Sequence, residues 1–206
     1  SVYHCVDRIQ EQPGMPTERI DAWEERLCRA AQVVFTTSPD LQANHCRWNH
    51  HTYFHGNVAD FQHFNRALHQ PSLACPQPLT LIPRPRLLFT GAIDAYKLDL
   101  PMTVSLARTN PNWSFVFVGP VGEADPSTEL AALRACPNVF VVGSQPYQDL
   151  PAWAAYSDLA LLPLQQNGYT RHMFPMKFFE YLAAGLAVVG TAIPALKIHS
   201  DVAWLC

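Results

Sequence analysis

Charged side chains are scarce in this sequence. Asp, Glu, Lys and Arg make up 15% of the 206 residues, and the formal net charge is −3. Binding of nucleic acid relies on clustered Lys and Arg that neutralise phosphates, so this balance gives no electrostatic reason to expect a nucleic-acid partner. Apolar residues make up 49% of the chain, which is enough for a core and argues against disorder.

Paired cysteine motifs and long apolar runs are also missing. The six cysteines are widely spaced and include no CxxC pair, so we expect buried thiols in a reducing compartment. The longest apolar run, residues 182–196, is interrupted by two glycines and a proline and is too short to span a bilayer. No signal peptide is recognisable, and we expect a cytoplasmic protein.

Motifs of several enzyme classes are absent. There is no GxSxG, Walker A, HExxH or DxD sequence, so nothing supports a hydrolase elbow, a P-loop or a metal-chelated diphosphate. A His-rich stretch, residues 44–57, places Cys46 four residues before His50 and His51 four residues before His55. Its aromatic residues favour packing, and no zinc framework surrounds it. We therefore expect no metal and no other cofactor.

From residue 86 onward, apolar segments alternate with amphipathic ones. Continuous apolar strands separated by helices are typical of a parallel sheet covered on both faces. The sequence therefore predicts an α/β fold with a Rossmann-like, doubly wound parallel sheet. The expected strands are RLLFTGAI, WSFVFVGP, NVFVVG, LALLPL and AVVGT, and the expected helices are LDLPMTVSLART, STELAALRAC, DLPAWAAYS with Asp149 as N-cap, and about 175–184.

Residues 1–50 show the same alternation, and a Pro-rich stretch separates the two blocks. We predict that residues 1–65 are the C-terminal part of one α/β domain, 66–85 a linker and 86–206 a second α/β domain. Both ends lie within apolar segments, so we expect both domains to be truncated.

Lys177 and Glu180 are the first candidate site. They are three residues apart, on one face of the helix that begins at about Pro175. The N-terminus of that helix attracts an anion, and Lys177 adds a positive charge. Glu180 suits neutral hydroxyls beside that anion, and a nucleotide offers a diol beside a diphosphate. A simple surface ion pair is an equally weighted alternative.

A second candidate follows the first strand of the second domain, in FTGAIDAYKLD. Gly91 permits a close backbone approach to a ligand, and Lys97 is long enough to reach a phosphate. The segment does not contain GxGxxG, so an ordinary strand-to-helix turn explains it as well.

The segment FPMKFFEYLAAGLAVVGT, residues 174–191, resembles the nucleotide-binding signature of GT-B glycosyltransferases of the retaining, group 1 type. The pieces around it follow in the family's order: TSPDL, FHGNVADFQHF, LLFTGAI, FVFVGP and NVFVVGSQPYQDLPAWAAYSDLALLPL. The likeness covers nearly the whole chain. Where the family often has a second glutamate, eight residues before the first, this sequence has His172.

The resemblance implies roles for individual residues. The glutamate that matches Glu180 binds ribose hydroxyls, and a lysine like Lys177 holds the diphosphate. Residues 142–145 lie against the base. The implied donor-binding set is Gly91, Lys97, Val142, Gly143, Ser144, Gln145, Thr170, Arg171, Lys177 and Glu180. The catalytic candidates are Lys177 and Glu180, with Asp7 on the acceptor side.

The resemblance also implies partners. These are a nucleotide-sugar donor, a glycan or lipid-linked acceptor in bacterial polysaccharide assembly, and an upstream acceptor domain. Peripheral contact with the inner face of the membrane is expected, if it occurs, through that upstream domain. The expected activity is hexosyl transfer, with the 206-residue chain inactive alone. A nucleotide-sugar epimerase, a phosphorylase and a non-catalytic nucleotide-binding fragment remain alternatives.

Overall fold

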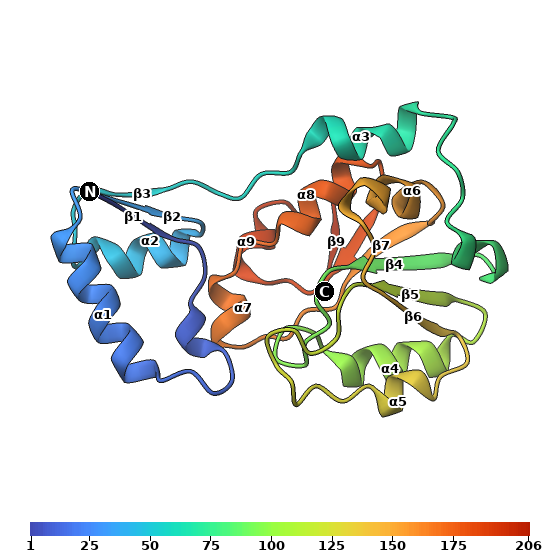
Figure 1. Ribbon diagram of the computed structural model, residues 1–206, viewed down its shortest axis with the longest axis horizontal. Coiled ribbons are helices and arrows are strands. Elements are labelled where there is room, and N and C mark those ends of the chain that lie inside the picture. Colours follow the sequence, from blue (N-terminus) through green and yellow to red (C-terminus); the bar gives the residue numbers. More distant parts are fainter. The chain divides into compact units, whose positions relative to one another are not determined.

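The computed structural model describes residues 1–206 and contains two parallel sheets (Figure 1). The residues group into two compact units. Unit 1 comprises residues 1–57, 166–175 and 193–198, and unit 2 comprises residues 58–165, 176–192 and 199–206. Each unit is a group of residues that contact one another and consists of several chain segments. Such units do not test the predicted domain boundaries at residues 65 and 85, which stay a prediction.

Unit 1 contains a three-stranded parallel sheet in the order β1-β2-β3. Helix α2 begins where expected, because Ser38 accepts a hydrogen bond from the Leu41 backbone and Pro39 occupies the first turn. The elements are β1 (Val2–Cys5), α1 (Thr17–Ala30), β2 (Val33–Thr36), α2 (Pro39–Cys46), β3 (Thr52–Phe54), α7 (Gly168–His172), α9 (Pro194–Lys197) and a 3-10 turn at Ile9–Glu11.

Unit 2 contains a six-stranded parallel sheet in the order β6-β5-β4-β7-β8-β9. Its strands are β4 (Arg86–Thr90), β5 (Ser114–Val118), β6 (Val139–Gly143), β7 (Leu159–Leu162), β8 (Val188–Gly190) and β9 (Trp204–Leu205). Its helices are α3 (Phe61–His69), α4 (Leu100–Thr109), α5 (Ala131–Arg134), α6 (Leu150–Ala155) and α8 (Met176–Ala183), with 3-10 turns at Gln77–Leu81 and Tyr147–Asp149.

The order of these strands locates a ligand-binding position in unit 2. The chain runs outward from β4 through β5 to β6 and then returns to place β7 on the other side of β4. Figure 1 shows α4 and α5 on one face of the sheet, with α3, α6 and α8 on the other. Ligands of open α/β sheets bind beyond the carboxyl ends of the strands where the order reverses. In unit 2 that point lies between β4 and β7.

Two local predictions differ from the structure. The segment STELAALRAC forms only the four-residue helix α5, because Thr128 is held in a turn where its hydroxyl accepts a hydrogen bond from the Ala95 backbone. The expected loop at 165–174 contains helix α7 instead. Asn167 and Thr170 form a capping box that starts this helix.

Asp149 precedes α6 as expected, but its side chain makes no capping hydrogen bond. The segment predicted as a linker holds the end of α3 and the 3-10 turn at Gln77–Leu81.

No helix in the structure combines the length and the apolar character that a membrane crossing requires.

Candidate active site

Helix α8 carries the first two candidate residues. Lys177 Nζ lies 2.9 Å from Glu180 Oε2, and the side chains of the two residues are 28% and 3% exposed. By spacing alone, a surface ion pair between Lys177 and Glu180 is an alternative to a ligand site. The carboxylate is buried, however, so the pair is not an ordinary surface contact, for which both partners are solvated.

The same helix is joined to strand β4 by Tyr181. The Tyr181 hydroxyl accepts a hydrogen bond from the Thr90 backbone at 2.7 Å and lies 3.2 Å from Thr90 Oγ1. Thr90 is the last residue of β4. This contact sets the position of α8, and therefore of Lys177 and Glu180, against the carboxyl end of the strand.

Gly91 lies under the Lys177 side chain. A β-carbon built on Gly91, where φ is +137°, would lie 3.7 Å from Lys177 Cε. The structure therefore brings together Gly91, Lys177 and Glu180, three residues that the sequence singled out from segments far apart in the chain. They meet at the point where the strand order reverses.

Glycines follow one another along this edge of the sheet. The Gly91 backbone nitrogen bonds to Val118, and the Gly119 nitrogen bonds to Gly143, each at 2.9 Å. A β-carbon on Gly119 would lie 1.9 Å from the Gly91 carbonyl oxygen. Sequence reasoning missed Gly119, although FVFVGP repeats the strand-then-glycine pattern of LLFTGAI.

The segment expected to contact the base follows the same edge. Val142 and Gly143 are the last residues of β6, and Ser144 and Gln145 come directly after it. Three strands thus present their carboxyl ends side by side, because β6 pairs with β5 and β5 with β4.

Tyr147, which the sequence did not single out, adds an aromatic face. Its ring stacks on His63 with centroids 4.4 Å apart and stays 47% exposed. Burial and the negative charges of Glu180 and Asp60 raise the pKa of the Tyr147 hydroxyl. The phenol is therefore within electrostatic range of the candidate carboxylate.

Lys97 is held within its own loop. Its Nζ lies 3.1 Å from Oδ2 of the fully buried Asp94, whose Oδ1 accepts hydrogen bonds from the Ala124 and Asp125 backbones. Burial alone would lower the pKa of Lys97, but hydrogen bonds to Tyr96 and Asp94 outweigh it and raise the pKa. The ammonium thus stabilises the loop through Asp94, a partner the sequence analysis did not identify.

The remaining candidates belong to unit 1. Thr170 is fully buried and takes part in the capping box of α7. Arg171 is exposed and pairs with Asp40 at 3.2 Å. Asp7 follows β1, where its carbonyl oxygen accepts a contact from Cys5 Sγ at 3.8 Å. The structure does not bring these three residues together with Lys177 and Glu180 in one unit.

Two solved structures resemble this chain over nearly its whole length. HepE of Anabaena, in complex with UDP and glucose, superposes with a TM-score of 0.68 at 18% identity, over 100% of this chain and 57% of that one. Sucrose-phosphate synthase of Thermosynechococcus elongatus gives 0.70 at 18% identity, over 99% of this chain and 53% of the other. These likenesses confirm the predicted fold, and the chain spans about half the length of either protein.

Sequence comparison identifies the family. A Bacillus subtilis protein described as "Putative teichuronic acid biosynthesis glycosyltransferase TuaH" is 36% identical over 107 residues, which are 52% of this chain and 26% of that protein. The family described as "Glycosyl transferases group 1" matches residues 84–204, which include β4, α8 and the whole glycine-lined edge of the sheet. The chain therefore belongs to the group 1 glycosyltransferases.

Proposed function

We propose that unit 2 binds the nucleoside diphosphate of a nucleotide-sugar, and that the sugar is transferred to an acceptor in bacterial polysaccharide assembly. One observation carries this proposal. The Lys177–Glu180 pair, with its buried carboxylate, lies beside Gly91 where the strand order reverses. A cation next to a buried acceptor of hydrogen bonds matches the charge pattern of a diphosphate next to a ribose.

Each residue has a defined task in this reaction. Lys177 and the N-terminus of α8 stabilise the negative charge that develops on the departing diphosphate. Glu180 accepts hydrogen bonds from the ribose hydroxyls, and Gly91 lets the β4 backbone approach the phosphates. Residues 142–145 lie against the base. Thr170, Arg171 and Asp7 belong to unit 1, and the proposal for unit 2 gives them no task.

Comparison with other proteins guides the choice of substrates. HepE was crystallised with UDP and glucose, which supports UDP-hexoses as the first donors to test. The description of the B. subtilis relative names teichuronic acid biosynthesis, which supports a cell-surface polysaccharide or its lipid-linked precursor as the acceptor.

Calorimetric titration of the chain with UDP, GDP and ADP tests the donor assignment. We expect one of the three to bind, and Lys177→Ala to weaken that binding by about tenfold or more, because a charge-assisted contact to phosphate is lost. Lys197→Ala is the matched control, since Lys197 is exposed in unit 1. Equal affinity of Lys177→Ala and the parent protein would refute the assignment.

Assays of this chain joined to an acceptor domain distinguish transfer from the other reactions. Sugar transfer to an acceptor supports the proposal. Epimerisation of the nucleotide-sugar without an acceptor would identify an epimerase, and turnover that requires inorganic phosphate would identify a phosphorylase. Nucleotide binding with no turnover under any condition would leave a non-catalytic module.

A further inference from the structure

Three side chains of the types that bind metals converge in the interior of unit 1. Cys5 comes from β1, Glu24 from α1 and His45 from α2, and they are 3%, 4% and 0% exposed. One potential ligand atom from each lies within 4.8 Å of the other two. The proposed donor site uses none of these residues.

Two of the three distances between the ligand atoms fit a single small cation. Glu24 Oε1 lies 3.3 Å from Cys5 Sγ and 3.2 Å from His45 Nε2. A tetrahedral Zn²⁺ with bonds of about 2.0–2.3 Å holds neighbouring ligand atoms roughly 3.3–3.6 Å apart. Both distances lie within a few tenths of an ångström of that spacing, and the third pair, Cys5 Sγ and His45 Nε2, lies within 4.8 Å.

The orientation of His45 supports a ligand at this place. Its Nδ1 lies 2.6 Å from the Leu41 carbonyl oxygen, so that nitrogen donates its proton there and Nε2 is the ring nitrogen that faces Glu24. Metal-binding histidines have this second contact to a carbonyl or carboxylate. Nε2 is fully buried yet is not oriented to form a hydrogen bond with Glu24.

A second polar atom in the same network also lacks a partner. Gln10 donates from its amide nitrogen to Glu24 Oε2 at 3.0 Å, while its own Oε1 is buried without a hydrogen bond. Buried polar atoms without partners are rare, and a bound ion or water is one of the accepted explanations.

From this geometry we infer a zinc site formed by Cys5 Sγ, Glu24 Oε1 and His45 Nε2. On binding, the Cys5 thiol releases its proton to solvent and the sulfur forms a bond to Zn²⁺. Thiolate, carboxylate and neutral imidazole then carry two negative charges, which the ion balances, so the buried site is neutral. The thiolate and imidazole favour zinc over magnesium or calcium.

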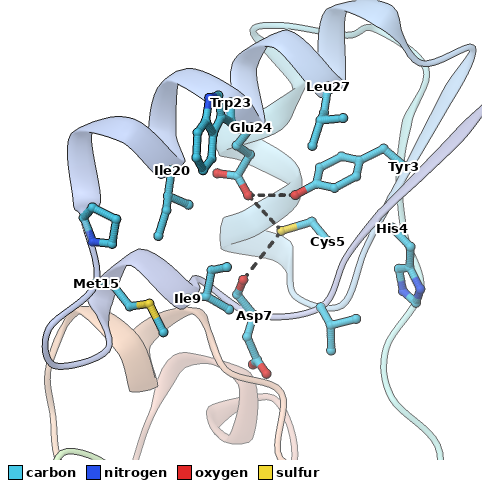
Figure 2. A pocket seen from close by; sticks show the side chains of 12 residues that line it. Tyr3, His4, Cys5, Asp7, Ile9, Met15, Ile20, Trp23, Glu24 and Leu27 are labelled. Carbon is cyan, nitrogen blue, oxygen red and sulfur yellow. Dashed lines mark hydrogen bonds between the residues drawn. The ribbon is translucent and has the colours of Figure 1, made fainter. Parts of the chain in front are cut away.

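A cavity of about 620 Å³ is lined by Cys5 and Glu24, two of the three proposed ligands. Figure 2 shows the Glu24 carboxylate, the Cys5 sulfur and the Tyr3 hydroxyl grouped at its wall, while the Asp7 carboxylate points away from them. Tyr3 donates to Glu24 Oε1 at 3.1 Å, which orients the carboxylate as an outer-shell partner. We expect a water from the cavity to supply the fourth ligand.

The competing explanation is an ion pair without metal, in which a protonated His45 faces Glu24 and Cys5 stays a thiol. Cobalt distinguishes the two. After dialysis against EDTA, the 206-residue chain is titrated with Co²⁺, and the near-ultraviolet absorption of a thiolate–cobalt bond is recorded. We expect the band to saturate at one equivalent and Zn²⁺ to abolish it.

Variants assign the ligands. Cys5→Ser should lose the thiolate band and His45→Gln should weaken binding at least tenfold, while Cys136→Ser, a buried cysteine of unit 2, should behave as the parent. If Cys5→Ser does not fold, X-ray absorption of the zinc-loaded parent must show one sulfur and several nitrogen or oxygen neighbours. No binding by the parent, or cobalt binding without sulfur, overturns the site in favour of the ion pair.

Discussion

The hydroxyl of Tyr181 accepts the hydrogen bond of the Thr90 backbone N–H, which has no partner on the neighbouring strand β7. The donor–acceptor distance to the Thr90 nitrogen is 2.7 Å, and Tyr181 is only 2% exposed. The register of β4 with β7 covers Leu87 and Leu88 and does not extend to Thr90. A side chain on helix α8 thus satisfies the last backbone donor of the strand, next to the residues proposed to bind the diphosphate.

Tyr181→Phe should therefore destabilise the protein. The substitution leaves the Thr90 N–H buried without a partner, which costs about 1–3 kcal/mol. Urea unfolding followed by circular dichroism measures the change. Tyr53→Phe is the control, because Tyr53 is 48% exposed, and its stability should match that of the parent. A Tyr181→Phe protein as stable as the parent would show that the hydrogen bond does not hold α8 to β4.

Glu180→Gln should weaken nucleoside diphosphate binding without unfolding the protein. A hydrogen bond from a hydroxyl to a carboxylate contributes on the order of 1.5–3 kcal/mol, so the loss should be about tenfold or more. Calorimetry measures it, with Glu129→Gln, an exposed acid of the same unit, as the control. Unchanged affinity in a folded Glu180→Gln variant would remove the ribose role.

Gly119→Ala should disrupt the edge of the sheet in unit 2. The new β-carbon would lie 1.9 Å from the Gly91 carbonyl oxygen, which forces backbone atoms apart. We expect a loss of more than about 3 kcal/mol of stability, or no soluble protein. Gly143→Ala is the comparison: nothing lies within 4 Å of its β-carbon, so only the cost of its positive φ remains, about 1–2 kcal/mol. Thermal unfolding ranks the two.

EDTA should leave nucleotide binding unchanged. The proposed donor contacts come from Lys177, Glu180 and the backbone near Gly91, and the chain has no DxD sequence to chelate a metal. The cluster of Cys5, Glu24 and His45 belongs to unit 1, so zinc can be removed from it without loss of these contacts. Parallel titrations with and without EDTA check this, and a loss of affinity on chelation would contradict it.

The 206-residue chain should bind nucleotide but transfer no sugar. The sheet of unit 1 has three strands, which we expect to be too few to form an acceptor pocket, and alignment of the acceptor supplies a large share of the rate. Transfer from radiolabelled UDP-glucose should appear only when an acceptor domain is joined to this chain. Robust transfer by this chain would refute the argument.

Local sequence patterns predicted much of the fold. The apolar strands of unit 2 and the helix that carries Lys177 and Glu180 follow from periodicity, because each lies within one segment. The assignment of residues 166–175 to unit 1 depends on contacts with residues far away in the chain, and no local pattern reports such contacts. The start of helix α7 could have been predicted locally, because Asn167 and Thr170 have the three-residue spacing of a capping box.

Local patterns also failed to predict the cluster that contains His45, a residue of the histidine-rich stretch. The spacing of Cys46 and His50 suggests a possible metal site. The buried residues of α2 are instead Leu41 and His45, four residues apart on the inner face of the helix. Helical periodicity from Leu41 would have found His45. Its neighbours Cys5 and Glu24 come from other elements, and only the folded chain brings them together.

The path of the chain also limits how this protein can be divided. It passes from one unit to the other five times, after residues 57, 165, 175, 192 and 198. No single cut therefore separates the units: a fragment that starts at residue 58 would carry helices α7 and α9 without the rest of unit 1. Residues 1–57 would in turn lose two of their packing segments. Neither unit is a continuous segment, which makes this chain a poor source of isolated domains.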